Sequence, residues 1–149
     1  MAVDVNLVKK PYRQERYTES QIQEITKCIN DPKYFLQQHC FIQHPTKGRM
    51  KFDLYDYQER LVDVYHNYRY SIAMLPRQTG KSTCAAGYLL WYAMFNKDAT
   101  ILIAAHKYSG AQEIMQRIRF AYETLPNFVR AGVTAYNKGS MEFDNGSRI

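Results

Sequence analysis

Two continuous apolar segments, each leading into a helix-like segment, constrain the fold of this chain more than any other feature. The first is Tyr70-Ser-Ile-Ala-Met-Leu75 before a helix-like stretch at 81–95, and the second is Thr100-Ile-Leu-Ile-Ala-Ala105 before one at about 109–125. Consecutive apolar residues are typical of strands covered on both faces, as in parallel sheets. Strand, helix, strand and helix in this order predict right-handed crossovers. We therefore expect an α/β fold with a parallel sheet and flanking helices.

The turn after the first apolar segment carries residues suited to binding phosphate. It reads Pro76-Arg-Gln-Thr-Gly-Lys-Ser-Thr83. Gly80 lets the backbone approach an anion, the Lys81 ammonium can reach the β- and γ-phosphates of a nucleoside triphosphate, and the Ser82 hydroxyl can ligate Mg²⁺. The full P-loop pattern also asks for glycine where this chain has Leu75. The motif predicts a P-loop NTPase using ATP and Mg²⁺, with an ordinary strand–turn–helix as the alternative.

A second motif lies upstream of this turn. The segment Leu54-Tyr-Asp-Tyr-Gln58 places Gln58 23 residues before Lys81. A carboxamide offers both a donor and an acceptor, which suits the edge of adenine. Tyr57 would stack near the base or simply pack. The alternative for Gln58 is an ordinary surface residue at the start of a helix.

These segments resemble the large terminase subunits of tailed bacteriophages, most closely those of myovirus type. Leu54 to Gln58 is similar to the adenine-reading Q motif of helicase-like ATPases, and residues 76–83 resemble the variant Walker A loop of terminases. Residues 101–112 and 134–149 resemble segments that follow this loop in that family. The resemblance covers the chain from about residue 30 onward. It implies a RecA/helicase-like P-loop NTPase fold.

The resemblance implies a viral DNA-packaging motor that couples ATP hydrolysis to translocation of double-stranded DNA into a procapsid. Arg77 and Lys81 would be catalytic, with Arg77 sensing the γ-phosphate or stabilising its charge, and Ser82 would hold Mg²⁺. The nucleotide-binding residues would be Gln58, Pro76, Arg77, Gln78, Thr79, Gly80, Lys81, Ser82 and Thr83. The implied partners are the viral DNA, the portal protein and the small terminase subunit. The implied setting is an oligomer on the portal, in the host-cell cytoplasm and outside the mature virion.

One element of a hydrolytic P-loop enzyme is missing from the sequence. Such an enzyme needs acidic residues at the end of a second buried strand to hold Mg²⁺ and polarise water. By resemblance this Walker B strand would follow Ile149. We therefore expect an amino-terminal fragment or split-gene product that binds nucleotide weakly and hydrolyses it negligibly alone. The expected division is an extension and first helix at 1–30 and an incomplete ATPase domain at 31–149.

Composition leaves two alternatives open. The net charge is +6 with a pI of about 9.2, which favours polyanionic partners such as nucleic acid. A fragment of a superfamily 2 helicase or restriction translocase would share the Q motif and Walker A loop. A non-catalytic basic nucleic-acid-binding module would share the charge alone. We expect no membrane partner, because no apolar run is long enough to span a bilayer.

Local signals predict further elements. Thr18 and Gln21 form a capping box before a helix, and Asp31-Pro32 ends that helix and starts another. Residues 40–43 and 50–54 read as a hairpin, 56–68 as a helix, and 132–136 with 140–144 as strands.

Three further expectations concern packing and ligands. Residues 1–16 are expected to form an extended, partly mobile lead-in. The core face of the 81–95 helix is expected to carry Ala85, Leu89, Tyr92 and Ala93. The three cysteines suit free thiols, and His39, Cys40 and His44 fit no zinc signature, so a hydrogen-bonded local histidine is the preferred interpretation.

Overall fold

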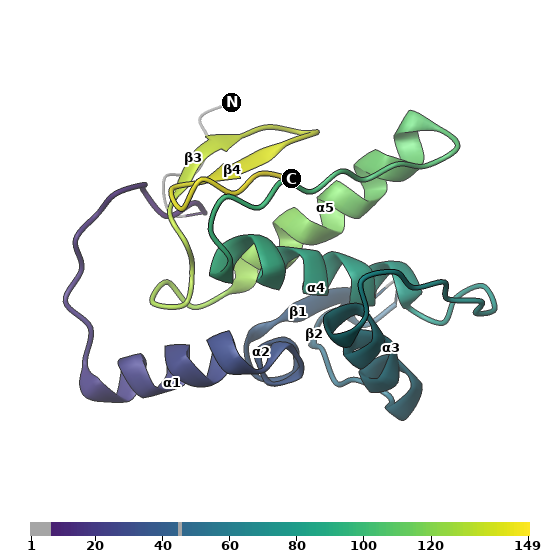
Figure 1. Cartoon of the computed structure of the whole chain (residues 1–149), viewed down its shortest axis with the longest axis horizontal. Helices are drawn as coiled ribbons and strands as arrows, with labels where there is room; N and C mark the ends of the chain where they lie inside the picture. Colours follow the sequence, from purple (N-terminus) through teal and green to yellow (C-terminus); the bar gives the residue numbers. More distant parts are fainter. Residues whose placement is uncertain (1–6, 45) are drawn as a thin grey trace.

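The computed structural model describes residues 7–44 and 46–149 and is dominated by helices (Figure 1). Its elements are α1 (Glu19–Asn30), α2 (Pro32–His39), β1 (Phe41–His44), β2 (Gly48–Lys51), α3 (Asp56–Asn67), α4 (Lys81–Phe95), α5 (Tyr108–Thr124), β3 (Val133–Tyr136) and β4 (Met141–Phe143). No helix among the described residues has both the length and the apolar character needed to cross a bilayer.

The expected parallel sheet is wrong. Over the described ranges, the strands form two small antiparallel sheets, β1 with β2 and β3 with β4. The apolar segments 70–75 and 100–105 are extended but form no strands, and the side chains of Ile72, Met74 and Leu102 are 93%, 91% and 90% exposed. The protein is therefore not a RecA-like P-loop fold.

The physical reason lies in backbone pairing. A strand exists only where a neighbouring backbone accepts and donates its hydrogen bonds, and an apolar run does not specify that neighbour. The segment 100–105 meets another backbone at one point, where Ile101 N–H donates to Arg148 O at 2.9 Å and Thr100 forms an isolated parallel bridge to Arg148. These two apolar segments are therefore not paired into either sheet.

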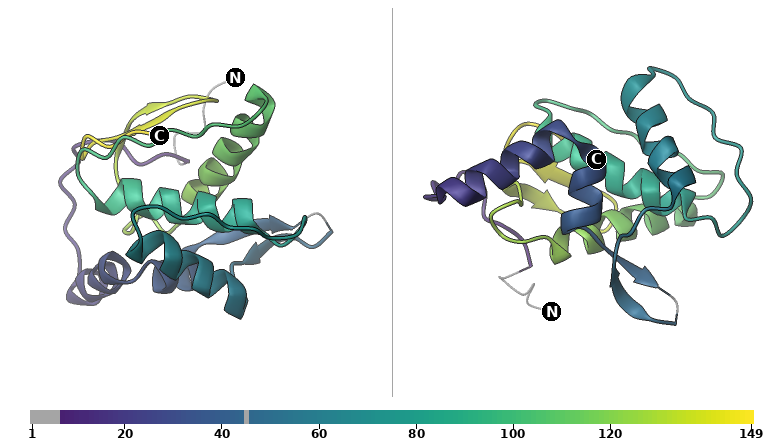
Figure 2. Two further views of the ribbon diagram at one scale, coloured as in Figure 1. Left: turned by 45° about the vertical axis from the view of Figure 1, so that its right-hand side comes forward. Right: turned by 90° about the horizontal axis from the view of Figure 1, so that it is seen from below.

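Helix α4 is the centre of the core and packs on α2, α3 and α5 (Figures 1 and 2). Its buried residues occupy most of its circumference: Cys84, Ala86, Gly87, Tyr88, Leu90, Trp91, Ala93 and Met94. The expected core face is correct only for Ala93, because Ala85 and Leu89 are half-buried and Tyr92 is 41% exposed. A helix with neighbours on several sides has no single apolar stripe, so its period does not identify a buried face.

The local capping predictions are confirmed. Thr18 and Gln21 form the capping box of α1, with Thr18 N–H donating to Gln21 Oε1 at 3.0 Å. Asp31 caps α2 by accepting from the backbone N–H groups of Lys33 and Tyr34 at 2.8 and 3.2 Å. These bonds satisfy amide groups that a helix start leaves unpaired.

The segment before α1 is packed rather than free over residues 7–17, while residues 1–6 of the expected lead-in lie outside the described residues. Lys9 is 8% exposed; its backbone accepts from Val133 N–H at 3.0 Å, and its ammonium pairs with Glu15 at 3.1 Å. Tyr12 N–H donates to Asp144 Oδ2 at 3.1 Å. The segment therefore fastens the β3–β4 hairpin to the helices.

Candidate nucleotide-binding loop

The loop at residues 76–80 joins the exposed segment 70–75 to the start of α4. The chain between α3 and α4 forms a long loop that turns back into the first residue of α4, Lys81 (Figure 2). The phosphate-binding residues predicted from the sequence therefore lie at and just before a helix start. The first amide groups of a helix have no intrahelical partner and attract anions.

Gly80 holds the conformation that this turn requires. It caps α4 with φ of 76° and ψ of 11°, and its carbonyl accepts the first helical bond from Cys84 N–H at 2.9 Å. A Cβ at this position would lie 2.6 Å from Gln58 Nε2. Both the left-handed backbone and the close contact require glycine here.

The side chains of the loop close it on itself. Lys81 Nζ donates to Pro76 O at 3.2 Å, and Thr79 Oγ1 donates to the same carbonyl at 3.0 Å. Gln78 has a positive φ of 65°, so two residues of the turn are left-handed. The loop is a compact turn in which the Lys81 ammonium lies over the backbone at Pro76.

Gln58 contacts this loop directly. Its Nε2 donates to Thr79 O at 3.0 Å, and its Oε1 accepts from Tyr55 N–H at 3.0 Å, so both ends of the carboxamide are engaged. The residue is 5% exposed. Gln58 thus ties the start of α3 to the loop, and its second N–H and second oxygen lone pair remain for the edge of an adenine. The adenine contact stays a prediction.

Two tyrosines beside Gln58 complete this contact. Tyr57 OH donates to Thr79 O at 2.9 Å, and the Tyr55 and Tyr57 rings stack with centroids 5.7 Å apart. From the sequence, Tyr57 could either stack on a base or pack within the protein, and no role was predicted for Tyr55. Two tyrosines on either side of the first residue of α3 were the sequence signal that could have indicated this stacked pair. Tyr55 is 66% exposed and Tyr57 39% exposed, so the stacked pair forms a surface next to the loop.

The remaining predicted residues differ in what surrounds them. Arg77 is exposed and has no hydrogen bond or ion pair with any residue the structure describes. Ser82 is half-buried, and its hydroxyl likewise has no partner in the described chain. Both side chains are therefore available to a ligand. Burial raises the pKa of the Cys84 thiol, two residues further along α4, to about 12, so this cysteine is a neutral packing residue.

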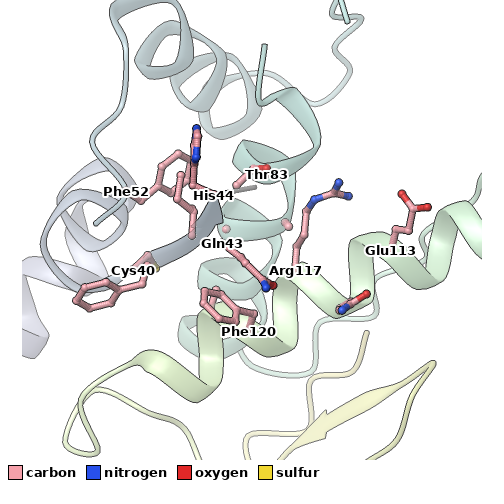
Figure 3. A pocket seen from close by; sticks show the side chains of 14 residues that line it. Cys40, Gln43, His44, Phe52, Thr83, Glu113, Arg117 and Phe120 are labelled. Atoms are coloured by element: carbon pink, nitrogen blue, oxygen red, sulfur yellow. The ribbon is translucent and has the colours of Figure 1, made fainter. Parts of the chain in front are cut away.

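A cavity of about 480 Å³ lies on another side of α4, between β1, α4 and α5 (Figure 3). Thr83 is the one residue of the predicted loop that lines it, with Arg117 of α5 extending toward it. Phe52 and Phe120 supply apolar walls. Neither Gly80 nor Lys81 borders the cavity, so it meets the predicted phosphate-binding residues only at Thr83.

A family comparison identifies what the second half of the chain is similar to. Residues 72–149 match the family described as terminase large subunit, T4likevirus-type, N-terminal. The matched part begins four residues before Pro76 and contains the whole loop, α4, α5 and both strands of the second sheet. Gln58 and the helices α1 to α3 lie before it.

Proposed function

The chain belongs to the T4likevirus-type terminase large subunits, and from this membership we propose that it is the ATP-binding part of a motor that drives double-stranded DNA into a procapsid. A role in DNA packaging follows from the family. The finer proposal is that residues 76–83 hold the triphosphate of ATP and that the motor uses its hydrolysis.

Three features of the loop support phosphate binding. The amide groups at the start of α4 follow a left-handed glycine and have no intrahelical hydrogen-bond partner. Lys81 bonds only to a backbone carbonyl at 3.2 Å, a contact that a phosphate would replace with a charge-assisted one. Arg77 is an exposed residue of the loop and would stabilise charge on the transferred phosphoryl group, which is the main task of such residues.

Mg²⁺ and adenine would be bound by neighbouring side chains. The unpartnered Ser82 hydroxyl is the group that would ligate Mg²⁺ between the β- and γ-phosphates. The Tyr55–Tyr57 pair lies on the side of the loop where Gln58 approaches, so a base bound there would find an aromatic surface as well as a carboxamide.

Family membership also supports the proposed setting. Double-stranded DNA is the substrate of packaging, and the net charge of +6 suits such a polyanion. The portal protein and the small terminase subunit are the proposed partners, with several copies acting on the portal in the host-cell cytoplasm. The family match favours this function over a helicase or restriction translocase fragment and over a basic module without nucleotide.

The observation that carries the proposal is the position of Gly80-Lys81-Ser82 at the start of α4 inside the matched family region. Calorimetric titration of the chain with ATP and Mg²⁺ tests it. Lys81→Ala is expected to weaken binding by about tenfold or more, because a charge-assisted contact is lost. Lys138→Ala removes the same charge from an exposed position in the turn between β3 and β4 and is expected to bind as wild type does. Equal affinities for wild type and Lys81→Ala would contradict the proposed site.

A further inference from the structure

Three potential metal ligands meet where the first two helices join. Glu24 and Cys28 belong to α1, and His39 is the last residue of α2. One carboxylate oxygen, the Cys28 Sγ and one imidazole nitrogen all lie within 4.8 Å of one another. His39 Nε2 is 2.9 Å from Glu24 Oε1. The cluster lies outside the matched family region and away from the loop at 76–80.

The fold brings these residues together for simple reasons. Glu24 and Cys28 are four residues apart on α1 and therefore share one face of that helix. Asp31 and Pro32 end α1 and begin α2, so the chain turns at this corner and the far end of α2 returns to the same face. Because His39 is remote in sequence from Glu24 and Cys28, no short motif marks the cluster.

The donor set has the chemistry of a zinc site. Thiolate, imidazole and carboxylate are the three protein ligands of zinc, in an approximately tetrahedral arrangement with ligand atoms about 3.5 Å apart. Because all pairs lie within 4.8 Å, no pair of these atoms needs to approach by more than about 1.3 Å. A thiolate and a carboxylate together balance the charge of a divalent cation, so the loaded site would be neutral. A fourth position would take water.

Outer contacts already orient the ligands on α1. Tyr34 OH donates to Glu24 Oε1 at 2.8 Å, and Trp91 Nε1 donates to Cys28 O at 2.7 Å. The bond to the Glu24 carboxylate is of the kind that fixes ligand geometry in known metal sites, whereas the bond from Trp91 holds the α1 backbone at Cys28. Cys28 is fully buried, whereas the side chains of His39 and Glu24 are 11% and 25% exposed, so the cluster reaches solvent on its imidazole and carboxylate side.

We propose that Glu24, Cys28 and His39 bind one zinc ion, which fastens α1 to the end of α2. Coordination replaces the hydrogen bond between His39 and Glu24, and the Cys28 thiol gives up its proton to solvent as the metal–sulfur bond forms. Lys27 pairs with Glu24 at 3.8 Å, but its side chain is 61% exposed and can swing into solvent. Because Trp91 of α4 holds Cys28, the metal would also anchor this helix pair to the central helix.

Titration of the metal-free chain with Co²⁺ tests the proposal directly. A Co²⁺–thiolate bond gives a near-ultraviolet charge-transfer band that carboxylate and imidazole ligands do not produce. Wild type is expected to show this band, to lose it when Zn²⁺ is added, and to melt at a higher temperature with Zn²⁺ than without. Cys28→Ala should abolish the band. Cys84→Ala, which removes another fully buried thiol, should retain it.

A second variant guards against a folding defect in Cys28→Ala. Glu24→Gln keeps an oxygen for Tyr34 to bond and changes a side chain that is 25% exposed, so circular dichroism should show an intact fold. It is expected to bind Co²⁺ about tenfold or more weakly, because an anionic ligand is lost. A wild-type chain without the band, a band that survives Cys28→Ala, or a Glu24→Gln variant with wild-type affinity would each overturn the proposal.

Discussion

Replacing Gly80 with alanine is expected to destabilise the chain through its contact with Gln58. An alanine at φ of 76° costs about 1 kcal/mol, because its Cβ approaches the backbone in the left-handed region. That Cβ would also lie 2.6 Å from Gln58 Nε2 and push the carboxamide away from Thr79 O. Losing this part-buried hydrogen bond costs about 1 kcal/mol more. Gly80→Ala should therefore lower the free energy of unfolding by about 2 kcal/mol in urea titrations.

Gly48 provides a matched control for the backbone contribution. Its φ is 69°, close to that of Gly80, but a Cβ there would meet no atom within 4 Å. Gly48→Ala should therefore cost about 1 kcal/mol from strain alone. The difference between the two variants measures what the approach of Gln58 to the loop contributes.

A double-mutant cycle separates this contact from any other effect at position 80. In a Gln58→Ala background the close atom is gone, so Gly80→Ala should cost only the backbone strain of about 1 kcal/mol. The expected coupling between the two sites is then about 1 kcal/mol. Equal costs for Gly80→Ala and Gly48→Ala, together with no coupling to Gln58, would refute the reasoning.

Two further predictions concern the attachment of the first segment and of α1. The hydrogen bond from Lys9 holds the pKa of Glu15 below its usual value of 4.5. The ionised Glu15 therefore stabilises the fold above pH 4.5, and this stabilisation is lost as the pH falls through the lower pKa of the folded state. Glu15→Gln should make the free energy of unfolding less dependent on acidic pH, as measured by urea midpoints at several pH values. Trp91→Phe leaves the buried carbonyl of Cys28 without its donor at 2.7 Å and should lower the free energy of unfolding by about 1–3 kcal/mol. Unfolding is followed by circular dichroism, because the variant removes the single tryptophan that fluorescence would report. A loss below about 0.5 kcal/mol would show that water replaces the indole donor.

The helices and hairpins were predictable because their signals are local. A Thr18–Gln21 capping box and an Asp31 cap act over three residues or fewer, and the structure forms both. The placement of the segments 70–75 and 100–105 was not predictable. An apolar run indicates a preference for burial, but it does not determine which backbone segment will pair with it. Within the described chain this preference is met only in part: Leu75, Ile101 and Ile103 are half-buried against the core, whereas Ile72 and Leu102 are exposed.

The sequence predicted which residues belong to the candidate site better than it predicted how they are arranged. The loop motif and Gln58 could be read from their residue types, and the structure places Gln58 against the loop through Thr79 O. Their roles in binding ATP stay predictions. The cluster of Glu24 and Cys28 with His39 was hidden, because His39 lies 11 residues beyond Cys28 on another helix and its approach depends on how α2 folds back toward α1.

The docking of residues 7–17 has a consequence for how the protein is made. Tyr12 finds its acceptor on Asp144, 132 positions further along, and Lys9 bonds with Tyr122 and Val133. During synthesis the segment leaves the ribosome before any of these partners has been translated. Residues 7–17 must therefore stay undocked until β3 and β4 have been released, so their docking follows the synthesis of every helix between them.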